Sequence, residues 1–179
     1  MTSKRASLLA VSLMLATVAI DQLSKWAVVE NLEPNTSYPV LGEWFRLYLV
    51  RNPGAAFSLG TDATVVFSCI QIAAVALCLF LAFRAKSWWS ILPIGLIGGG
   101  AAGNLIDRIF RYPGNLHGHV VDFFSFGSFA IFNVADSAIT VGVALYLLYT
   151  VFIEPRRSSQ PEHEAKREGE GFRGEEAQS

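Results

Sequence analysis

Four stretches of the sequence are each long and apolar enough to cross a lipid bilayer, and this feature constrains the fold most. A transmembrane helix needs about 20 largely apolar residues, because its backbone groups must all be hydrogen-bonded within the segment. The stretches that qualify are residues 8–29, 63–83, 88–109 and 132–153. Only 16% of the 179 residues are charged, which favours membrane spans over one soluble core. We therefore predict an all-α integral membrane protein, residues 1–157, with four transmembrane helices and a small extracytoplasmic segment of strand and loop.

The distribution of Lys and Arg predicts the orientation of these spans. A four-span topology places on one side the basic residues Lys4, Arg5, Arg84, Lys86, Arg156 and Arg157. Cytoplasmic flanks of membrane proteins carry such an excess, so we expect both termini in the cytoplasm. Arg46, Arg51 and Arg111 lie on the opposite side and weaken the bias. A cleaved signal peptide in place of the first span is disfavoured, because the apolar run is long and no A-x-A site precedes Asp21.

Residues 30–61 and 110–131 form the two segments on the extracytoplasmic side. The stretch EWFRLYLVR at 43–51 is rich in aromatic and β-branched residues, which predicts a short strand or hairpin. Asn52-Pro53-Gly54 is a turn signal that ends it. The many aromatic residues in both segments are typical of the boundary between water and lipid. Residues 158–179 are rich in Glu, Arg, Ser, Gln and Gly, which predicts a disordered cytoplasmic tail.

Four aspartates fall at one level of this predicted topology. Asp21 and Asp107 lie late in the two outward-going helices. Asp136 lies early in an inward-going helix, and Asp122 lies in the outer segment just before it. An ionisable side chain inside a span costs about 2.5–3.5 kcal/mol at mid-bilayer, so such residues are functional candidates. We therefore expect these carboxylates, distant in sequence, to gather at the outer face of the membrane.

Asp21 and Asp107 also have an ordinary structural interpretation. Asp21 and Lys25 are four residues apart on one helix and can form an ion pair. Asp107 adjoins Arg108, and Asn104 lies on the same helix face as Asp107. We therefore expect these groups to be scaffold residues that order a polar site.

Asp122 and Asp136 are the stronger candidates for chemistry. Neither has a cation nearby in sequence, and Asp122 lies in the apolar stretch HVVDFFSF. A partly desolvated setting of this kind raises the pKa of a carboxyl. Two such groups can share one proton, so that the ionised one activates a water and the protonated one polarises a carbonyl. A purely structural role for Asp136 as a helix N-cap stays open on spacing alone.

Other chemistries have weaker support in the sequence. His117 and His119 could bind a metal together with an aspartate, but there is no H-E-x-x-H motif and no cysteine cluster. Cys69 and Cys78 lie on opposite sides of one predicted helix and are interpreted as small apolar side chains. The formal net charge of −1 provides no basic field for nucleic acid. We therefore expect no metal, no cofactor and no nucleic-acid partner.

Gly95, Gly99 and Gly103 recur every four residues along one face of the third predicted helix. Small residues at this spacing let transmembrane helices approach closely, which predicts a packing role. The spacing leaves open whether the partner helix belongs to the same chain or to a second copy. A monomer is the expected state.

Over about residues 8–153 the chain resembles the lipoprotein signal peptidases, also called type II or prolipoprotein signal peptidases. The motifs that carry the resemblance are DQLSKW at 21–26, VRNPGAAFSLG at 50–60, GGAAGNLIDRI at 99–109, GHVVDFF at 118–124 and FNVADSAITVG at 132–142. Each motif alone is weak evidence for membership of this family. Their order on a four-span pattern makes the resemblance specific.

The resemblance implies an aspartic endopeptidase of the bacterial cytoplasmic (inner) membrane whose site faces the extracytoplasmic side. Its substrates would be prolipoproteins whose Cys carries diacylglycerol, cut immediately before that Cys, with membrane lipid as the surrounding partner. The catalytic pair of the family maps onto Asp122 and Asp136. The supporting residues map onto Asp21, Lys25, Asn52, Gly54, Asn104, Asp107, Arg108 and Asn133.

Two functions from other classes remain as alternatives. A small proton- or ion-coupled transporter also carries intramembrane aspartates, but it spreads them through the depth of the bilayer. A membrane-embedded assembly factor would bind partners through the small-residue face, and it would tolerate replacement of the aspartates by Asn.

Overall fold

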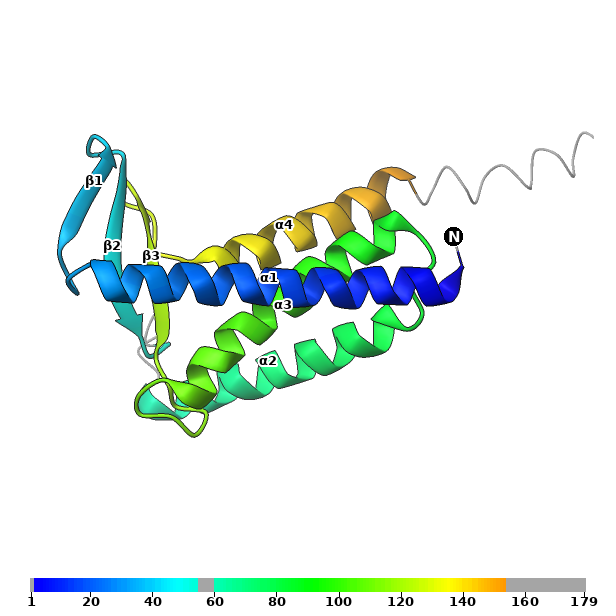
Figure 1. Cartoon of the computed structure of the whole chain (residues 1–179), viewed down its shortest axis with the longest axis horizontal. Coiled ribbons are helices and arrows are strands. Elements are labelled where there is room, and N and C mark those ends of the chain that lie inside the picture. The colour runs from blue at the N-terminus through cyan, green and yellow to red at the C-terminus, as the bar shows by residue number, and fades with distance from the viewer. Residues whose placement is uncertain (1, 55–59, 154–179) are drawn as a thin grey trace, which may run out of the picture.

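The computed structural model describes residues 2–54 and 60–153 of the chain, as a bundle of long helices with a small sheet at one end (Figure 1). The helices are α1 (Ser3–Asn31), α2 (Gly60–Ala82), α3 (Trp88–Phe110) and α4 (Val134–Leu148), which a π-helical segment (Tyr149–Ile153) continues. Within the described ranges, four helices are long and apolar enough to cross a membrane, which confirms the predicted membrane fold. The predicted disordered tail at 158–179 lies outside the described residues. Residues 55–59, which belong to the motif at 50–60, lie outside them as well.

The sheet is antiparallel and has the order β1–β2–β3, formed by Ser37–Leu41, Phe45–Asn52 and Val120–Phe126. β2 confirms the strand expected within residues 43–51. β3 was not predicted, because its sequence VVDFFSF is a nearly continuous apolar run without the alternation that marks a half-buried strand. It becomes a strand by pairing with β2, which lies far from it in sequence.

Helix α3 lies at the centre of the bundle and packs against each of the other three helices. Its glycines make this packing close. A Cβ atom added at Gly95, Gly99 or Gly103 would lie 2.5 Å from a side-chain atom of α1. A Cβ at Gly100 would lie 2.5 Å from the carbonyl oxygen of Ala135 in α4. The glycine face therefore packs against helices of its own chain.

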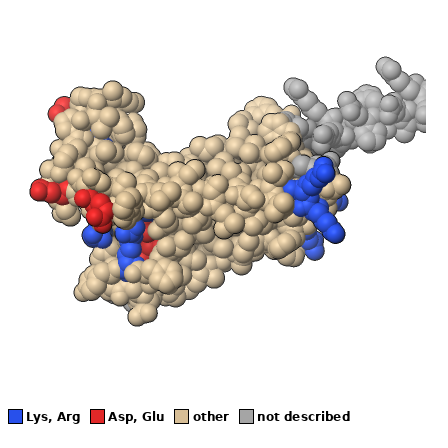
Figure 2. All heavy atoms as spheres, viewed as in Figure 1, with Lys and Arg blue, Asp and Glu red and all other residues tan. Residues whose placement is uncertain are grey.

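The charged side chains lie at the two ends of the molecule. In the face drawn in Figure 2, Lys and Arg gather at the end that holds the N-terminus, both signs appear near the sheet, and the surface between shows no charge. At the sheet end, an apolar cluster formed by Val28, Leu49, Val121 and Phe123 packs the end of α1 against β2 and β3. This cluster holds β3, and with it Asp122, over the end of the bundle.

Candidate active site

Asp122 lies in the middle of β3, paired in register with Val50 of β2, and is only 3% exposed. Each carboxylate oxygen accepts one hydrogen bond from an asparagine. Nδ2 of Asn52 donates to Oδ2 at 2.8 Å, and Nδ2 of Asn133 donates to Oδ1 at 2.6 Å. No Lys, Arg or His of the described residues forms an ion pair with Asp122.

Asp136 lies in the first turn of α4, where it forms a capping box with the N-cap residue Asn133. Oδ1 of Asn133 accepts from the backbone N–H of Asp136 at 3.0 Å, and Oδ2 of Asp136 accepts from the backbone N–H of Asn133 at 3.2 Å. Asp136 is thus the third helical residue rather than the N-cap itself. Its other oxygen, Oδ1, accepts from Nδ2 of Asn104 at 2.8 Å.

Two asparagine side chains join the two aspartates. Asn133 binds the side chain of Asp122 and the backbone of Asp136 at once. Its Nδ2 also donates to Oδ1 of Asn104 at 3.1 Å, and Asn104 in turn donates to Asp136. The structure therefore brings Asp122, Asp136, Asn104 and Asn133 into one network, although they come from β3, α3 and the start of α4.

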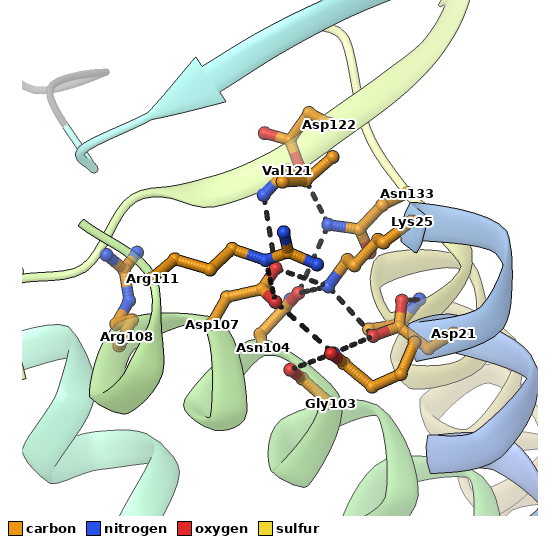
Figure 3. A network of polar contacts seen from close by, with 12 residues as sticks. Asp21, Lys25, Gly103, Asn104, Asp107, Arg108, Arg111, Val121, Asp122 and Asn133 are labelled. Atoms are coloured by element: carbon orange, nitrogen blue, oxygen red, sulfur yellow. Dashed lines mark hydrogen bonds and ion pairs between the residues drawn. The ribbon is translucent and has the colours of Figure 1, made fainter. Parts of the chain in front are cut away.

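Lys25 supports this network from below (Figure 3). Its Nζ lies 2.8 Å from Oδ2 of Asp21 and 2.9 Å from Oδ2 of Asp107, and all three side chains are completely buried. Nζ also donates to Oδ1 of Asn104 at 2.9 Å. The expected pair of Asp21 with Lys25 is present. Asp107 pairs with Lys25 and with Arg111, at 2.6 Å, rather than with the adjacent Arg108.

The two scaffold aspartates also hold backbone groups beside the site. Oδ1 of Asp21 accepts from the backbone N–H of Ala135 at 2.9 Å, so a residue of α1 helps to cap α4. Oδ2 of Asp107 accepts from the backbone N–H of Val121 at 3.1 Å, next to Asp122 in β3. These two bonds fix the elements that carry Asp122 and Asp136 relative to the bundle.

Gly54 and Arg108 lie near Asn52, the asparagine that binds Asp122 through its side chain. The backbone N–H of Gly54 donates to Oδ1 of Asn52 at 2.8 Å, which leaves the amide nitrogen of Asn52 to face Asp122. Gly54 has a φ of +87°, and a Cβ there would lie 3.4 Å from Nη2 of Arg108, so this turn favours glycine. The guanidinium of Arg108 lies 5.9 Å from the ring of Phe67.

Arg108 faces the aspartates without pairing with them. It is 5% exposed, and its Nη1 donates to the carbonyl of Gly118 at 3.3 Å. Its Nε is buried and has no hydrogen-bond partner among the described residues. Its positive charge is close enough to act electrostatically on Asp122, Asp107 and Asp136. A buried cation without a full set of partners suits contact with a bound molecule.

The surroundings of Asp122 raise its pKa to about 6. Burial away from water is the largest cause, and hydrogen bonding by Asn52 acts in the opposite direction. The charge of Asp136 raises the pKa further, whereas Asn133 and Lys25 lower it. Asp122 thus titrates close to neutral pH, which suits a carboxyl group that must exchange a proton during a reaction.

Gln22 and Arg111 belong to the network but were not among the predicted site residues. Nε2 of Gln22 donates to Oδ2 of Asp21 at 3.1 Å, to the carbonyl of Gly103 at 3.0 Å and to Oδ1 of Asp107 at 3.3 Å. The spacing of four between Asp107 and Arg111 could have identified Arg111. For Gln22 no comparable signal was present, since its partners lie mostly on another helix.

A metal site at His117 and His119 was the weaker alternative in the sequence. Among the described residues, no three His, Cys, Asp or Glu side chains are grouped so that they could hold a metal ion. His117 is exposed, and its Nδ1 lies 3.0 Å from the carbonyl oxygen of Asn115.

Comparison with known proteins identifies the family. Residues 13–152 match the family model described as signal peptidase (SPase) II. The chain belongs to the signal peptidase II family. Members of this family are membrane proteases that process lipoproteins. The network around Asp122 and Asp136 is therefore the candidate active site of a signal peptidase II.

Similar proteins agree with this assignment. A lipoprotein signal peptidase of Rhodococcus jostii is 43% identical over 139 residues, covering 77% of this chain and 70% of the relative. One of Mycobacterium avium is 40% identical over 144 residues, covering 80% and 79%. A solved structure described as a bacterial membrane enzyme, obtained by the in meso method, has a TM-score of 0.71 and 27% identity, and covers 80% of this chain and 93% of its own.

Proposed function

We propose that this signal peptidase II removes the signal peptide from diacylglyceryl-modified prolipoproteins, cutting immediately before the lipidated Cys. In this proposal Asp122 and Asp136 bind one water between them and act as an aspartic dyad. The observation that carries it is the pair of carboxylates on separate elements, linked through Asn133 and not ion-paired with any cation of the described residues. Two carboxyl groups placed in this way can divide the roles of acid and base.

The reaction begins with one proton shared by the dyad. In this proposal Asp122, whose raised pKa of about 6 suits the exchange of a proton, carries the shared proton and polarises the scissile carbonyl oxygen. Asp136 accepts a proton as the water oxygen attacks the carbonyl carbon, and Asp122 gives its proton to the carbonyl oxygen. The tetrahedral diol then collapses. Its carbon–nitrogen bond breaks, the amine takes the proton from Asp136, and the diol returns a proton to Asp122.

Arg108 and the asparagines orient the reacting groups. The partly unpartnered guanidinium of Arg108 offers donors to the substrate backbone beside the dyad. Asn52 and Asn133 hold Asp122, and Asn104 holds Asp136. Lys25 takes no part in proton transfer, because its Nζ is committed to Asp21, Asp107 and Asn104.

The lipid on the substrate determines where the enzyme works. Each buried acyl CH₂ adds roughly 0.8 kcal/mol of membrane affinity, so the diacylglyceryl group keeps the scissile bond at the membrane surface. In the proposed topology both termini are cytoplasmic and the sheet lies against the outer leaflet. Phe124 and Phe126 share the face of β3 that carries Asp122, and Phe45 packs on both of them. This aromatic face serves as a platform over the substrate. If it does, shortening the β1–β2 hairpin reduces the rate of cleavage, and an unchanged rate would contradict the platform role.

The experiment compares wild type with Asp122→Asn and Asp136→Asn in detergent, on a diacylglyceryl-modified precursor with EDTA present. Asn retains the size of each side chain and removes its charge. Glu43→Gln is the matched control, because Glu43 is an exposed carboxylate at the other end of β2. Cleavage by wild type and control, with none by the two folded dyad variants, is expected. A dyad variant that cuts at the normal rate, or an inactive wild type, would refute the proposal, and an inactive wild type would favour a transporter.

A further inference from the structure

We infer that the sheet carries a second binding site, for the phosphate group of a phospholipid, on the face opposite Asp122. A pocket of about 250 Å³ opens there beside the loop that follows β3. Among its lining residues are Arg46 and Tyr48 of β2, Ser125 of β3, and Ser128 and Phe129 of the loop. None of these residues has a role in the proposed cleavage.

The register of the sheet separates this pocket from the active site. Arg46 pairs with Ser125, next to the pair formed by Phe45 and Phe126. Side chains alternate between the two faces of a strand, so Ser125 points away from the face shared by Asp122 and Phe126. The pocket and the dyad therefore lie on opposite faces of β3.

The guanidinium of Arg46 is incompletely satisfied. Nη2 donates to the carbonyl of Gly127 at a long 3.3 Å. Nη1 lies 3.6 Å from Oε2 of Glu43, whose side chain is 90% exposed, so this ion pair contributes little. The Nε atom is buried and has no hydrogen-bond partner among the described residues. An incoming anion can therefore bind without breaking a strong interaction of Arg46.

Hydroxyl groups supply further donors. The described residues provide no hydrogen bond to the hydroxyls of Tyr48, Ser125 or Ser128, and each hydroxyl can donate one. One guanidinium and three hydroxyls make the pocket rich in donors. Arginine recognises phosphate through charge-assisted hydrogen bonds, which are stronger than neutral ones. This set of groups fits a phosphate oxyanion better than a cation or an apolar chain.

Exposed aromatic residues indicate that the phosphate belongs to a lipid. Trp44 is 66% exposed and Phe129 is 68% exposed, and Phe129 lines the pocket. Aromatic side chains of this kind settle at the depth of the headgroups, where phospholipid phosphates are concentrated. Binding there would hold the sheet on the membrane surface. Inorganic phosphate has the same chemistry and is the other source that must be tested.

Native mass spectrometry of the full chain in detergent tests the inference by titration with phosphatidylglycerol. Wild type is compared with Arg46→Gln, with Ser125→Ala as a milder second variant. Arg84→Gln is the control, since Arg84 is an exposed cation in the α2–α3 connection, at the opposite end of the bundle. We expect the tightest lipid adduct to weaken about tenfold in Arg46→Gln, less in Ser125→Ala, and not in the control. Diacylglycerol, which lacks phosphate, should show no difference between the proteins.

Three results would overturn the inference. Equal phosphatidylglycerol affinity in wild type, Arg46→Gln and Ser125→Ala would show that the pocket binds no phosphate. Equal weakening in Arg84→Gln would show only a general effect of charge. Inorganic phosphate is then added as a competitor at millimolar concentration. Displacement of the lipid adduct from wild type would assign the site to free phosphate and refute the lipid, whereas an undisturbed adduct supports it.

Discussion

The side-chain amide of Asn133 donates a hydrogen bond of 2.6 Å to Oδ1 of Asp122. The same side chain caps α4 through its Oδ1, which accepts from the backbone N–H of Asp136 at 3.0 Å. One residue thus carries out two tasks. It begins the helix that bears Asp136, and it fixes the strand residue Asp122 next to that helix.

Substitution of Asn133 can separate these tasks. Ser caps a helix about as well as Asn, but it cannot reach both Asp136 and Asp122. We expect Asn133→Ser to lower kcat/KM at least about tenfold and to cost about 1–3 kcal/mol of stability, because the buried carboxylate of Asp122 loses a hydrogen bond. Asn133→Ala should lose the cap as well, at a further cost of about 1 kcal/mol. Kinetics and thermal unfolding in detergent check this, and normal kinetics in Asn133→Ser would contradict it.

The pKa of Asp122 should move in opposite directions in two variants. Asn52→Ala removes a hydrogen bond to the charged form, so the pKa should rise above about 6. Asp136→Asn removes a neighbouring negative charge, so the pKa should fall below about 6. NMR titration of ¹³C-labelled aspartate carboxyl groups measures both, with Glu43→Gln as a control that should not shift Asp122. A pKa that stays the same in both variants would refute this account of the site.

Removal of Lys25 should destabilise the protein strongly. The change Lys25→Met leaves the buried Asp21 without its cation, whereas Asp107 retains Arg111. Breaking a buried pair in this way costs about 3–5 kcal/mol. The double variant Asp21→Asn/Lys25→Met should recover part of the loss, since no unpaired charge then remains at position 21. Thermal midpoints of wild type, Lys25→Met and the double variant form the test, and a double variant no more stable than Lys25→Met would count against it.

Gly103 should not tolerate a side chain. A Cβ at this position would lie 2.5 Å from Oδ2 of Asp21, so Gly103→Ala must push α1 away from α3. We expect a loss of about 1–3 kcal/mol and reduced cleavage, because the ion pair of Asp21 with Lys25 lies at this contact. Gly42→Asn is the control, since nothing lies within 4 Å of a Cβ there and Asn tolerates its φ of +57°. Equal stability of both variants would disprove the packing argument.

The proposed orientation can be tested by thiol labelling. In a background with Cys69→Ser and Cys78→Ser, single cysteines are introduced at Thr36, just before β1, and at Lys86, between α2 and α3. Both positions are exposed. A membrane-impermeant maleimide should label Thr36→Cys in intact spheroplasts and Lys86→Cys only after the membrane is opened. The reverse pattern would place the sheet in the cytoplasm.

The sequence predicted the four helices and, through the family resemblance, most residues of the polar network, although not Gln22 or Arg111. Hydropathy over about 20 residues is a local property, and the span requirement admits few alternatives in lipid. The ion pair of Asp21 with Lys25 was also predictable, because both residues lie on one helix at a spacing of four. The strand within residues 43–51 was visible from its composition.

Contacts between elements were decided by the tertiary structure. β3 is a strand because it pairs with β2, and no pattern within its own residues marks that partner. Asp107 pairs with Lys25 of α1 rather than with Arg108 beside it. The glycines of α3 let α1 pack closely enough for Lys25 to reach the carboxylate of Asp107. The bond from Asn133 to Asp122 likewise depends on how α4 and β3 meet. Spans follow from composition along the chain, whereas hydrogen bonds require atoms from separate elements to be positioned within tenths of an ångström, which only packing achieves.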